Sequence, residues 1–269
     1  MAKTIVITSG KGGVGKTTST ANIGTALALQ DKKVCLVDMD IGLRNLDVVL
    51  GLENRIIYDL IDVVEGRAEV HQALIKDKRF EDSLYVLPAG QHADKNAITP
   101  ERMSEIIAEL DDFYDYILID SPAGIEQGFE NSVVAADAAV IITTPEISAI
   151  RDADRIVGIL EQRDLEPPKL VINRIRKEMM DKGDVMDVEE ITRHLSIELL
   201  GIIYDDDEVV RTSNKGAPVV LDPDQLSSQG YRNIARRILG ESVPLLTVKE
   251  EEEKVPFWRR IFGLGKKKK

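Results

Sequence analysis

The segment from Gly10 to Thr17, which reads Gly-Lys-Gly-Gly-Val-Gly-Lys-Thr, constrains the fold of this chain more than any other part of it. It fits the pattern G-x-x-x-x-G-K-[S/T], in which glycines let successive backbone N–H groups point at one anion. An apolar run over Thr4–Thr8 precedes it, and a helical pattern over Thr17–Leu29 follows it. The helix N-terminus adds partial positive charge, Lys16 would reach the β- and γ-phosphates, and the Thr17 hydroxyl would bind Mg²⁺. A glycine-rich turn that binds nothing is the alternative, and the complete strand–loop–helix context argues against it.

Short apolar runs alternate with helical patterns along the rest of the chain. The predicted strands are Thr4–Thr8, Val34–Val37, Leu84–Leu87, Tyr116–Ile119, Ala139–Thr143, Leu170–Ile172 and Leu199–Ile203. The predicted helices are Thr17–Leu29, Pro100–Leu110, Ser148–Gln162, Val188–Leu195 and Gln229–Leu239. Continuously apolar strands that alternate with helices indicate βαβ units. We therefore expect an α/β P-loop NTPase fold, a mostly parallel twisted sheet with helices on both faces and ligands at the carboxyl ends of the strands.

Length and charge divide the chain into a body and a terminal segment. We expect one ATPase domain over residues 1–245, an acidic tether over 246–254 and a terminal segment over 255–269. The net charge is −12, yet residues 255–269 hold six Lys and Arg residues and no acid. An acidic body does not favour nucleic acid, so no specific nucleic acid is expected as a partner. The absence of long apolar runs and of a signal-peptide pattern, together with a single cysteine, favours the cytosol.

Carboxylates close two of the predicted strands. Asp38 and Asp40 follow the second strand, and Asp120 follows the fourth. Mg²⁺ and an attacking water both require carboxylates, and these strand ends should lie beside the phosphate loop. For Asp38 and Asp47, capping of a helix or turn is a serious alternative.

A second lysine, Lys11, directly follows the first glycine of the loop. The run from Lys11 to Thr18 resembles the deviant Walker A motif of the MinD/ParA family of ATPases. In that family the first lysine contacts the nucleotide bound to the partner subunit, so the resemblance implies an ATP-dependent homodimer with Mg²⁺. The ATP-binding residues that it implies are Gly10, Lys11, Gly12, Gly13, Val14, Gly15, Lys16, Thr17, Thr18 and Asn173.

The resemblance also implies roles for the charged residues. Lys11 would stabilise transition-state charge as an arginine finger does elsewhere. Asp40 would orient the attacking water, Asp120 would hold Mg²⁺ through water, and Asp38 would support the loop. The implied catalytic residues are Lys11, Lys16, Asp40 and Asp120, and the implied metal-binding residues are Thr17, Asp40 and Asp120.

Two segments resemble nucleotide switches. The first is Asp40–Asp47, which includes Asn45. The second is Asp120–Gly124, in which Gly124 could sense the γ-phosphate. Both follow strands that should end beside the phosphate loop.

Asn173 follows a predicted strand, and in the family the asparagine at this place binds adenine through its paired donor and acceptor. A guanine reader of the N-K-x-D type would need aspartate where Arg176 stands, so ATP is favoured over GTP. The family usually has proline where this chain has Tyr204, which leaves the base contacts of that second loop open.

The terminal segment has an apolar and a basic side on a helix. Such a segment, with aromatic residues and four closing lysines, is typical of a membrane interface that contains anionic lipid. Two copies in one dimer would gain avidity, which would couple ATP to membrane binding. A terminal helix packed on the core and a helix for a partner's groove are the alternatives. The predicted membrane residues are Phe257, Trp258, Arg259, Arg260, Ile261, Phe262 and Leu264.

Body and terminal segment together resemble the branch of this family that places the bacterial division septum. That resemblance implies a MinC-like inhibitor and a MinE-like activator, which would bind near Arg44, Asn45, Arg151 and Asp152. It also implies a cytoplasmic protein that cycles to the inner face of the cell membrane. A flagellar-number ATPase, a chromosome-partition ATPase and an ATP-binding scaffold with little turnover remain alternatives.

Overall fold

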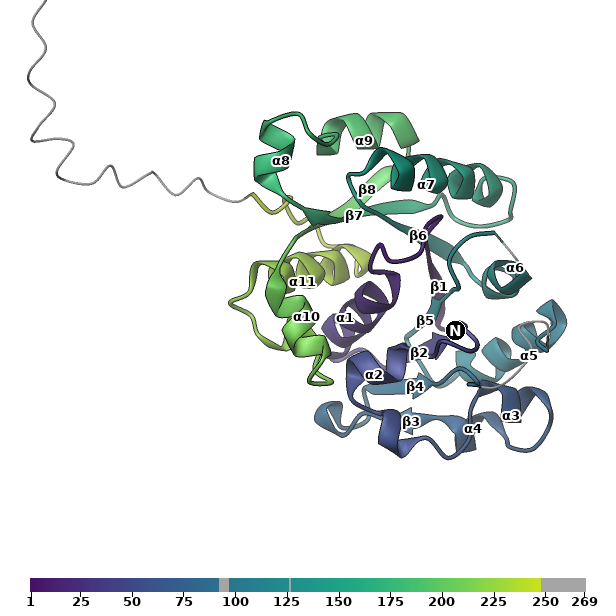
Figure 1. Cartoon of the computed structure of the whole chain (residues 1–269). Helices are drawn as coiled ribbons and strands as arrows, with labels where there is room; N and C mark the ends of the chain where they lie inside the picture. Colours follow the sequence, from purple (N-terminus) through teal and green to yellow (C-terminus); the bar gives the residue numbers. More distant parts are fainter. Residues whose placement is uncertain (92–96, 126, 248–269) are drawn as a thin grey trace, which may run out of the picture.

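A single eight-stranded sheet forms the centre of the structure (Figure 1). The computed structural model describes residues 1–91, 97–125 and 127–247. The strand order is β3-β4-β2-β5-β1-β6-β7-β8, and every neighbouring pair is parallel except β3 with β4. The strands are β1 (Lys3–Thr8), β2 (Val34–Asp38), β3 (Ile75–Lys76), β4 (Leu84–Leu87), β5 (Tyr116–Asp120), β6 (Ala138–Thr143), β7 (Lys169–Ile175) and β8 (Glu198–Tyr204).

Helices cover both faces of this sheet, which confirms the predicted α/β architecture (Figure 1). The helices are α1 (Lys16–Ala28), α2 (Leu46–Leu50), α3 (Leu60–Val64), α4 (Val70–Ala73), α5 (Pro100–Asp111), α6 (Gln127–Val133), α7 (Ile147–Leu160), α8 (Lys177–Asp181), α9 (Val188–Leu195), α10 (Asp207–Ser213) and α11 (Leu226–Ile238). Three short 3₁₀ turns add η1 (Glu53–Arg55), η2 (Lys78–Phe80) and η3 (Val219–Leu221).

Alternation along the strands divides the core into two layers. In β1, Val6 packs with the layer that includes α5, α6 and α7, whereas Ile5 and Ile7 pack with the layer that includes α1, α2 and α11. Successive side chains of a strand point to opposite faces, so an uninterrupted apolar strand fills both layers at once. This is the physical reason that the apolar runs predicted the sheet.

The seven predicted strands all exist, with ends that differ by up to three residues. β7 shows the largest difference, because it continues to Ile175 and therefore contains Asn173 rather than ending before it. Neither β3 nor the shortest helices were predicted, since elements of two to five residues carry little periodicity. Among the described residues, no helix has the length and apolarity needed to cross a membrane. The predicted membrane segment, residues 255–269, lies outside the described residues.

Candidate functional site

The phosphate loop joins β1 to α1 and is shaped by left-handed glycines. Gly15 immediately precedes α1 with φ +93°. A Cβ added there would lie 2.3 Å from Asn173 Nδ2, so both the backbone angle and the close approach require glycine. The first turn of α1 leaves its N–H groups directed at the loop, where an anion would be stabilised. The predicted cradle is therefore present as a geometric unit.

Lys16 and Asp120 form a buried ion pair at the base of this loop. Lys16 Nζ donates to Asp120 Oδ1 at 2.9 Å, and the side chains are only 7% and 1% exposed. Thr20 Oγ1, one turn along α1 from Lys16, lies 3.2 Å from the same carboxylate oxygen. Asp120 Oδ2 is buried without a hydrogen-bond partner among the described residues. A buried carboxylate oxygen without a donor has capacity for a further ligand, such as metal-bound water.

Asp38 closes the loop that leads from β2 to α2. Its Oδ1 accepts from Asp40 N at 2.9 Å and its Oδ2 accepts from Leu46 N, the first residue of α2, at 3.2 Å. This is the capping role that the sequence left as an alternative, and it also supports the first switch. Burial, and secondarily the charge of neighbouring Asp120, raises the pKa of Asp38 to about 8. Asp38 and Asp120 lie side by side because β2 and β5 pair in register.

Within the first switch, the Arg44 side chain turns inward onto Asp47. The two are 3.3 Å apart, and Arg44 is only 14% exposed on its side chain. Burial is the largest influence on the Asp47 carboxyl and raises its pKa, while Arg44 opposes that rise. Arg44 has φ +41°, an unusual backbone angle for arginine. In this conformation the Arg44 side chain contacts Asp47 within the switch, and little of it is exposed for contact with a partner.

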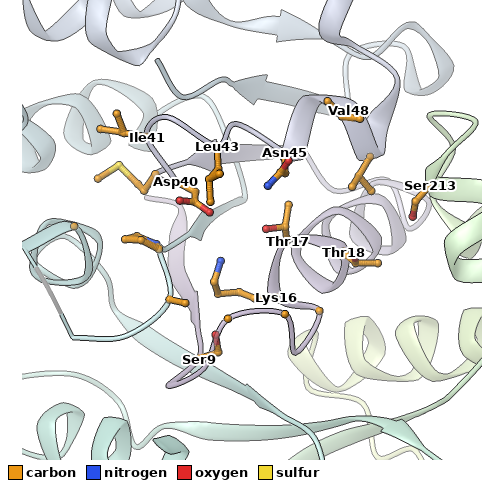
Figure 2. A pocket seen from close by; sticks show the side chains of 18 of the residues that line it. Ser9, Lys16, Thr17, Thr18, Asp40, Ile41, Leu43, Asn45, Val48 and Ser213 are labelled. Atoms are coloured by element: carbon orange, nitrogen blue, oxygen red, sulfur yellow. The ribbon is translucent and has the colours of Figure 1, made fainter. Parts of the chain in front are cut away.

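A cavity of about 850 Å³ opens above the loop. Figure 2 shows Lys16, Thr17, Asp40 and Asn45 pointing into the same space, with Ser213 farther to the right, beyond Thr18. The lining residues predicted from sequence are Gly12, Gly13, Gly15, Lys16, Thr17, Thr18, Asp40 and Asn45. A volume of this size is typical of a small-molecule or cofactor site.

A second cavity of about 420 Å³ continues from the first, with Gly15 and Thr18 lining both. Asn173 lines it, is buried, and donates from Nδ2 to Val14 O at 2.8 Å. Tyr204 lines the same cavity, so the structure brings the two predicted base-binding loops together. Because the amide nitrogen of Asn173 already bonds the loop, Asn173 also anchors the phosphate cradle to β7.

The first lysine of the loop faces α7 instead of either cavity. Lys11 Nζ donates to Ser148 Oγ at 2.9 Å, and Gly10 lies so close to α7 that an added Cβ would be 2.2 Å from Asp152 O. The loop is therefore in direct contact with the helix that carries the predicted partner residues Arg151, which is exposed, and Asp152, which is partly exposed. The predicted role of Lys11 toward a second subunit would require it to leave Ser148.

Gly124 also connects the loop to a switch. Its N–H donates to Ser9 O at 3.0 Å, and its φ is +91°. Sensing of a γ-phosphate by this N–H would require the bond to Ser9 to break. The structure thus places Gly124 beside the phosphate loop, as expected for the second switch.

The residues present fit a nucleotide with Mg²⁺. Mg²⁺ in nucleotide sites is held by one or two carboxylates, a hydroxyl and the phosphates themselves. Thr17 and Asp40 face the cavity, and Asp120 supplies the unpartnered oxygen. Within the described part of the chain, no group of three or more His, Cys, Asp or Glu residues could hold a metal alone, so phosphate oxygens would have to complete the shell.

Several residues of the site were missed by sequence reasoning. Arg174 lines both cavities and has φ +56°, at a place where the β7–β8 pairing is irregular. Ser213 and Asn214 form the wall contributed by α10. Lone polar residues carry no motif, and only the chain path brings these three to the site. A non-glycine residue at a positive φ is a signal that sequence does not display.

Comparison with known proteins agrees with this geometry. The family profile of the CobQ/CobB/MinD/ParA nucleotide binding domain matches residues 5–219. The chain is 63% identical over 254 residues to the septum site-determining protein MinD of Bacillus subtilis (strain 168), covering 94% of this chain and 95% of that protein. It is 45% identical over 272 aligned positions to the septum site-determining protein MinD of Escherichia coli (strain K12), covering 98% and 100%.

Solved structures give the same result. The fold matches MinD in a MinC:MinD cell division protein complex from Aquifex aeolicus, with a TM-score of 0.86, 52% identity and coverage of 91% of this chain and 99% of that one. It also matches a septum site-determining MinD complexed with Mg-ADP from Pyrococcus horikoshii, with a TM-score of 0.80, 30% identity and coverage of 88% and 96%. The family model and the high identity over nearly the whole chain confirm the resemblance read from the phosphate loop. The chain therefore belongs to the CobQ/CobB/MinD/ParA family of P-loop nucleotide-binding proteins, in its MinD branch.

Proposed function

We propose that this chain is a Mg²⁺-dependent ATP hydrolase that dimerises when ATP is bound and regulates placement of the bacterial division septum. The observation that carries the proposal is the phosphate cradle, where Lys16 and Asp120 are paired at its base and Asp40 faces the same cavity. A cation, a hydroxyl and two carboxylates around one anion site supply the parts that phosphoryl transfer requires.

Each residue has a separate task in this proposal. Lys16 exchanges its bond to Asp120 for the β- and γ-phosphates of ATP, which frees the Asp120 carboxylate. Asp40 accepts a hydrogen bond from the attacking water and orients it toward the γ-phosphorus. Thr17, Asp40 and Asp120 are the residues that would hold Mg²⁺, which neutralises developing phosphate charge when bound.

Dimerisation adds Lys11 of the second subunit. In the single chain Lys11 bonds Ser148, so its ammonium is withheld from both cavities. On dimerisation Lys11 contacts the nucleotide of the partner, where it stabilises the transition state. This order would keep turnover low until two ATP-bound chains meet.

The terminal segment allows the dimer to bind the membrane. The apolar side of residues 255–269 enters the interface of an anionic membrane, and the basic side stays with the headgroups. Two segments in one dimer bind more strongly than one, so ATP brings the protein from the cytoplasm to the inner membrane face and hydrolysis releases it. A MinC-like inhibitor and a MinE-like activator bind near Arg44, Arg151 and Asp152; the solved MinC:MinD complex of a relative supports the first of these partners.

Sedimentation with anionic vesicles tests this function. ATP should carry the full chain into the vesicle pellet, ADP should not, and removal of residues 255–269 should abolish the effect. A chain that hydrolyses ATP but does not bind vesicles would favour the chromosome-partition alternative. A chain that binds ATP and vesicles without measurable turnover would favour the scaffold.

A further inference from the structure

One arginine outside the nucleotide cavity joins the far ends of two elements that form its walls. Arg79 belongs to η2, in the connection between β3 and β4. Its Nη2 donates to Leu50 O at 2.6 Å, and its Nη1 donates to Gly216 O at 3.0 Å. Leu50 is the last residue of α2, and Gly216 lies three residues beyond the end of α10. Arg79 thus bridges the C-terminal ends of two helices that are far apart in sequence.

A buried carboxylate holds the guanidinium of Arg79 in this orientation. Asp77 is almost fully buried, and its two oxygens accept from Arg79 Nε and Nη2 at 2.6 to 3.1 Å. Asp77 Oδ1 also accepts from the Arg79 backbone N–H at 3.0 Å. One edge of the planar guanidinium therefore binds Asp77, and its remaining donors bind the carbonyls of Leu50 and Gly216, an arrangement that a lysine could not reproduce.

The two helix ends meet through their backbones at this point. Gly51 follows α2 with φ +69°, and Gly216 has φ +65°. A Cβ on Gly216 would lie 2.4 Å from Gly51 Cα, and a Cβ on Gly51 would lie 2.6 Å from Gly216 O. Both positions require glycine, so the junction leaves no room for the ends to slide past each other. In Figure 1 the end of α10 meets α2 beside the β3–β4 connection.

Both helices line the nucleotide cavity within one turn of this junction. Val48 and Val49 of α2 line the cavity, and so do Ser213, the last residue of α10, and Asn214, which follows it. Each wall is tied to its own end of the junction, since Gly51 N donates to Val48 O at 3.1 Å and Gly216 N donates to Ser213 O at 3.0 Å. If the helix ends at Gly51 and Gly216 moved apart, the residues that line the cavity would therefore move with them.

We propose that Arg79 is a positioning residue of the nucleotide site: it fixes the wall formed by α10 against the wall formed by α2. This inference rests on the proposed function, because it assigns a control of the same site. The chemistry itself depends on Lys16, Asp40 and Asp120, which other elements hold. Loss of Arg79 should therefore weaken nucleotide binding and leave the catalytic step largely intact.

Titration of the full-length chain with a fluorescent ADP analogue, together with steady-state ATP hydrolysis, tests the proposal. Arg79→Ala should raise both the dissociation constant for ADP and KM about tenfold, with kcat within about twofold of the unaltered chain. The ADP affinity of Arg79→Lys should lie between that of the unaltered chain and that of Arg79→Ala, because a single ammonium can replace only some of the N–H donors of the guanidinium. Gly216→Ala should weaken ADP binding in the same direction by forcing the two helix ends apart.

Arg55→Ala is the matched control. Arg55 also donates to a backbone carbonyl of the same region, at 3.2 Å, but its acceptor is Lys76 O of β3 and not a carbonyl at the end of α2 or beyond α10. The Arg55→Ala variant should bind ADP with the same affinity as the unaltered chain. If Arg79→Ala does not fold, Arg79→Lys carries the test in its place.

A folded Arg79 variant that binds ADP with unaltered affinity and KM would overturn the proposal, even if its melting temperature fell, since that pattern describes a purely structural arginine. Failure of the proposed function has a different signature. In that case the unaltered chain would itself bind no ADP or hydrolyse no ATP.

Discussion

Two edges of the same sheet carry ion pairs of nearly equal length in opposite surroundings. At the carboxyl ends of the strands, Lys16 and Asp120 are 2.9 Å apart and 7% and 1% exposed. At the amino ends, Lys3 and Glu166 are 2.8 Å apart and 40% and 53% exposed. Distance alone would rank these pairs as equals. Burial separates them, because removing one partner leaves an uncompensated charge only where water cannot reach.

The strand order brings the charged residues of the buried edge together. β5 lies between β2 and β1, so Asp120 comes next to Asp38 on one side and near the start of α1 on the other. At the exposed edge, Lys169 and Glu198 form a second solvated pair. The residues of the proposed function gather where the fold brings like and unlike charges together out of water.

Lys16→Ala should have the largest effect. It removes the cation from the phosphate site and leaves the Asp120 carboxylate buried without its partner. We expect loss of ATP binding in equilibrium titration and a loss of about 3–5 kcal/mol in the free energy of unfolding, measured by urea denaturation without nucleotide. Adding Asp120→Asn to this variant should restore part of the stability but none of the binding. Normal ATP affinity in Lys16→Ala would contradict the site.

Asp40→Ala should retain ATP and lose hydrolysis. The side chain faces the cavity, and the predicted role is to orient the attacking water. The loss of such a group lowers kcat by about 10²–10⁴-fold. Binding of a fluorescent ATP analogue should stay within a few-fold of the unaltered chain, because Lys16 and the glycine loop remain. Turnover at the normal rate would remove Asp40 from the mechanism.

Asp38 should make the nucleotide-free chain lose stability as the pH rises. Burial raises its pKa to about 8 in the folded chain, above its unfolded value, so folding favours the protonated form. The stabilisation is complete below the unfolded pKa of 3.8 and is lost progressively as the pH rises to about 8, with a slope of up to about 1.4 kcal/mol per pH unit that vanishes above the folded pKa.

Denaturation midpoints between pH 6 and pH 9 measure this slope. Asp38→Asn has no proton to lose at this position, so its stability should vary less over the same range. An Asp38→Asn profile parallel to that of the unaltered chain would show that another group is responsible.

Lys3→Ala should have the smallest effect, although its ion pair is the shorter of the two compared. An exposed pair contributes roughly 0.2–1 kcal/mol, and salt screens it. The free energy of unfolding should therefore change by less than about 1 kcal/mol, and ATP hydrolysis should not change. A loss comparable to that of Lys16→Ala would show that burial is not what distinguishes the two edges.

Sequence patterns predicted the longer elements of the fold and the residue types of the candidate site. Uninterrupted apolar runs predicted the seven longest strands, since a strand buried on both faces needs apolar side chains at every position. The run Gly10–Thr17 predicted the phosphate cradle, because its glycines, lysine and hydroxyl all act within a few residues of one another. Asp40 and Asp120 could be placed at strand ends for the same reason: the relevant information is local.

Which of these residues contact one another depends on the tertiary structure. Lys16 and Asp120 pair across 104 positions of sequence, and Asn173 reaches Val14 across 159. Lys11 lies against Ser148, and Arg79 joins α2 to α10, although no motif connects these positions. Such contacts follow from strand order and from the close approach of backbones at Gly51 and Gly216. Local propensity predicts neither the strand order nor the close approach of backbones, because each depends on how the whole chain packs its two core layers against one sheet.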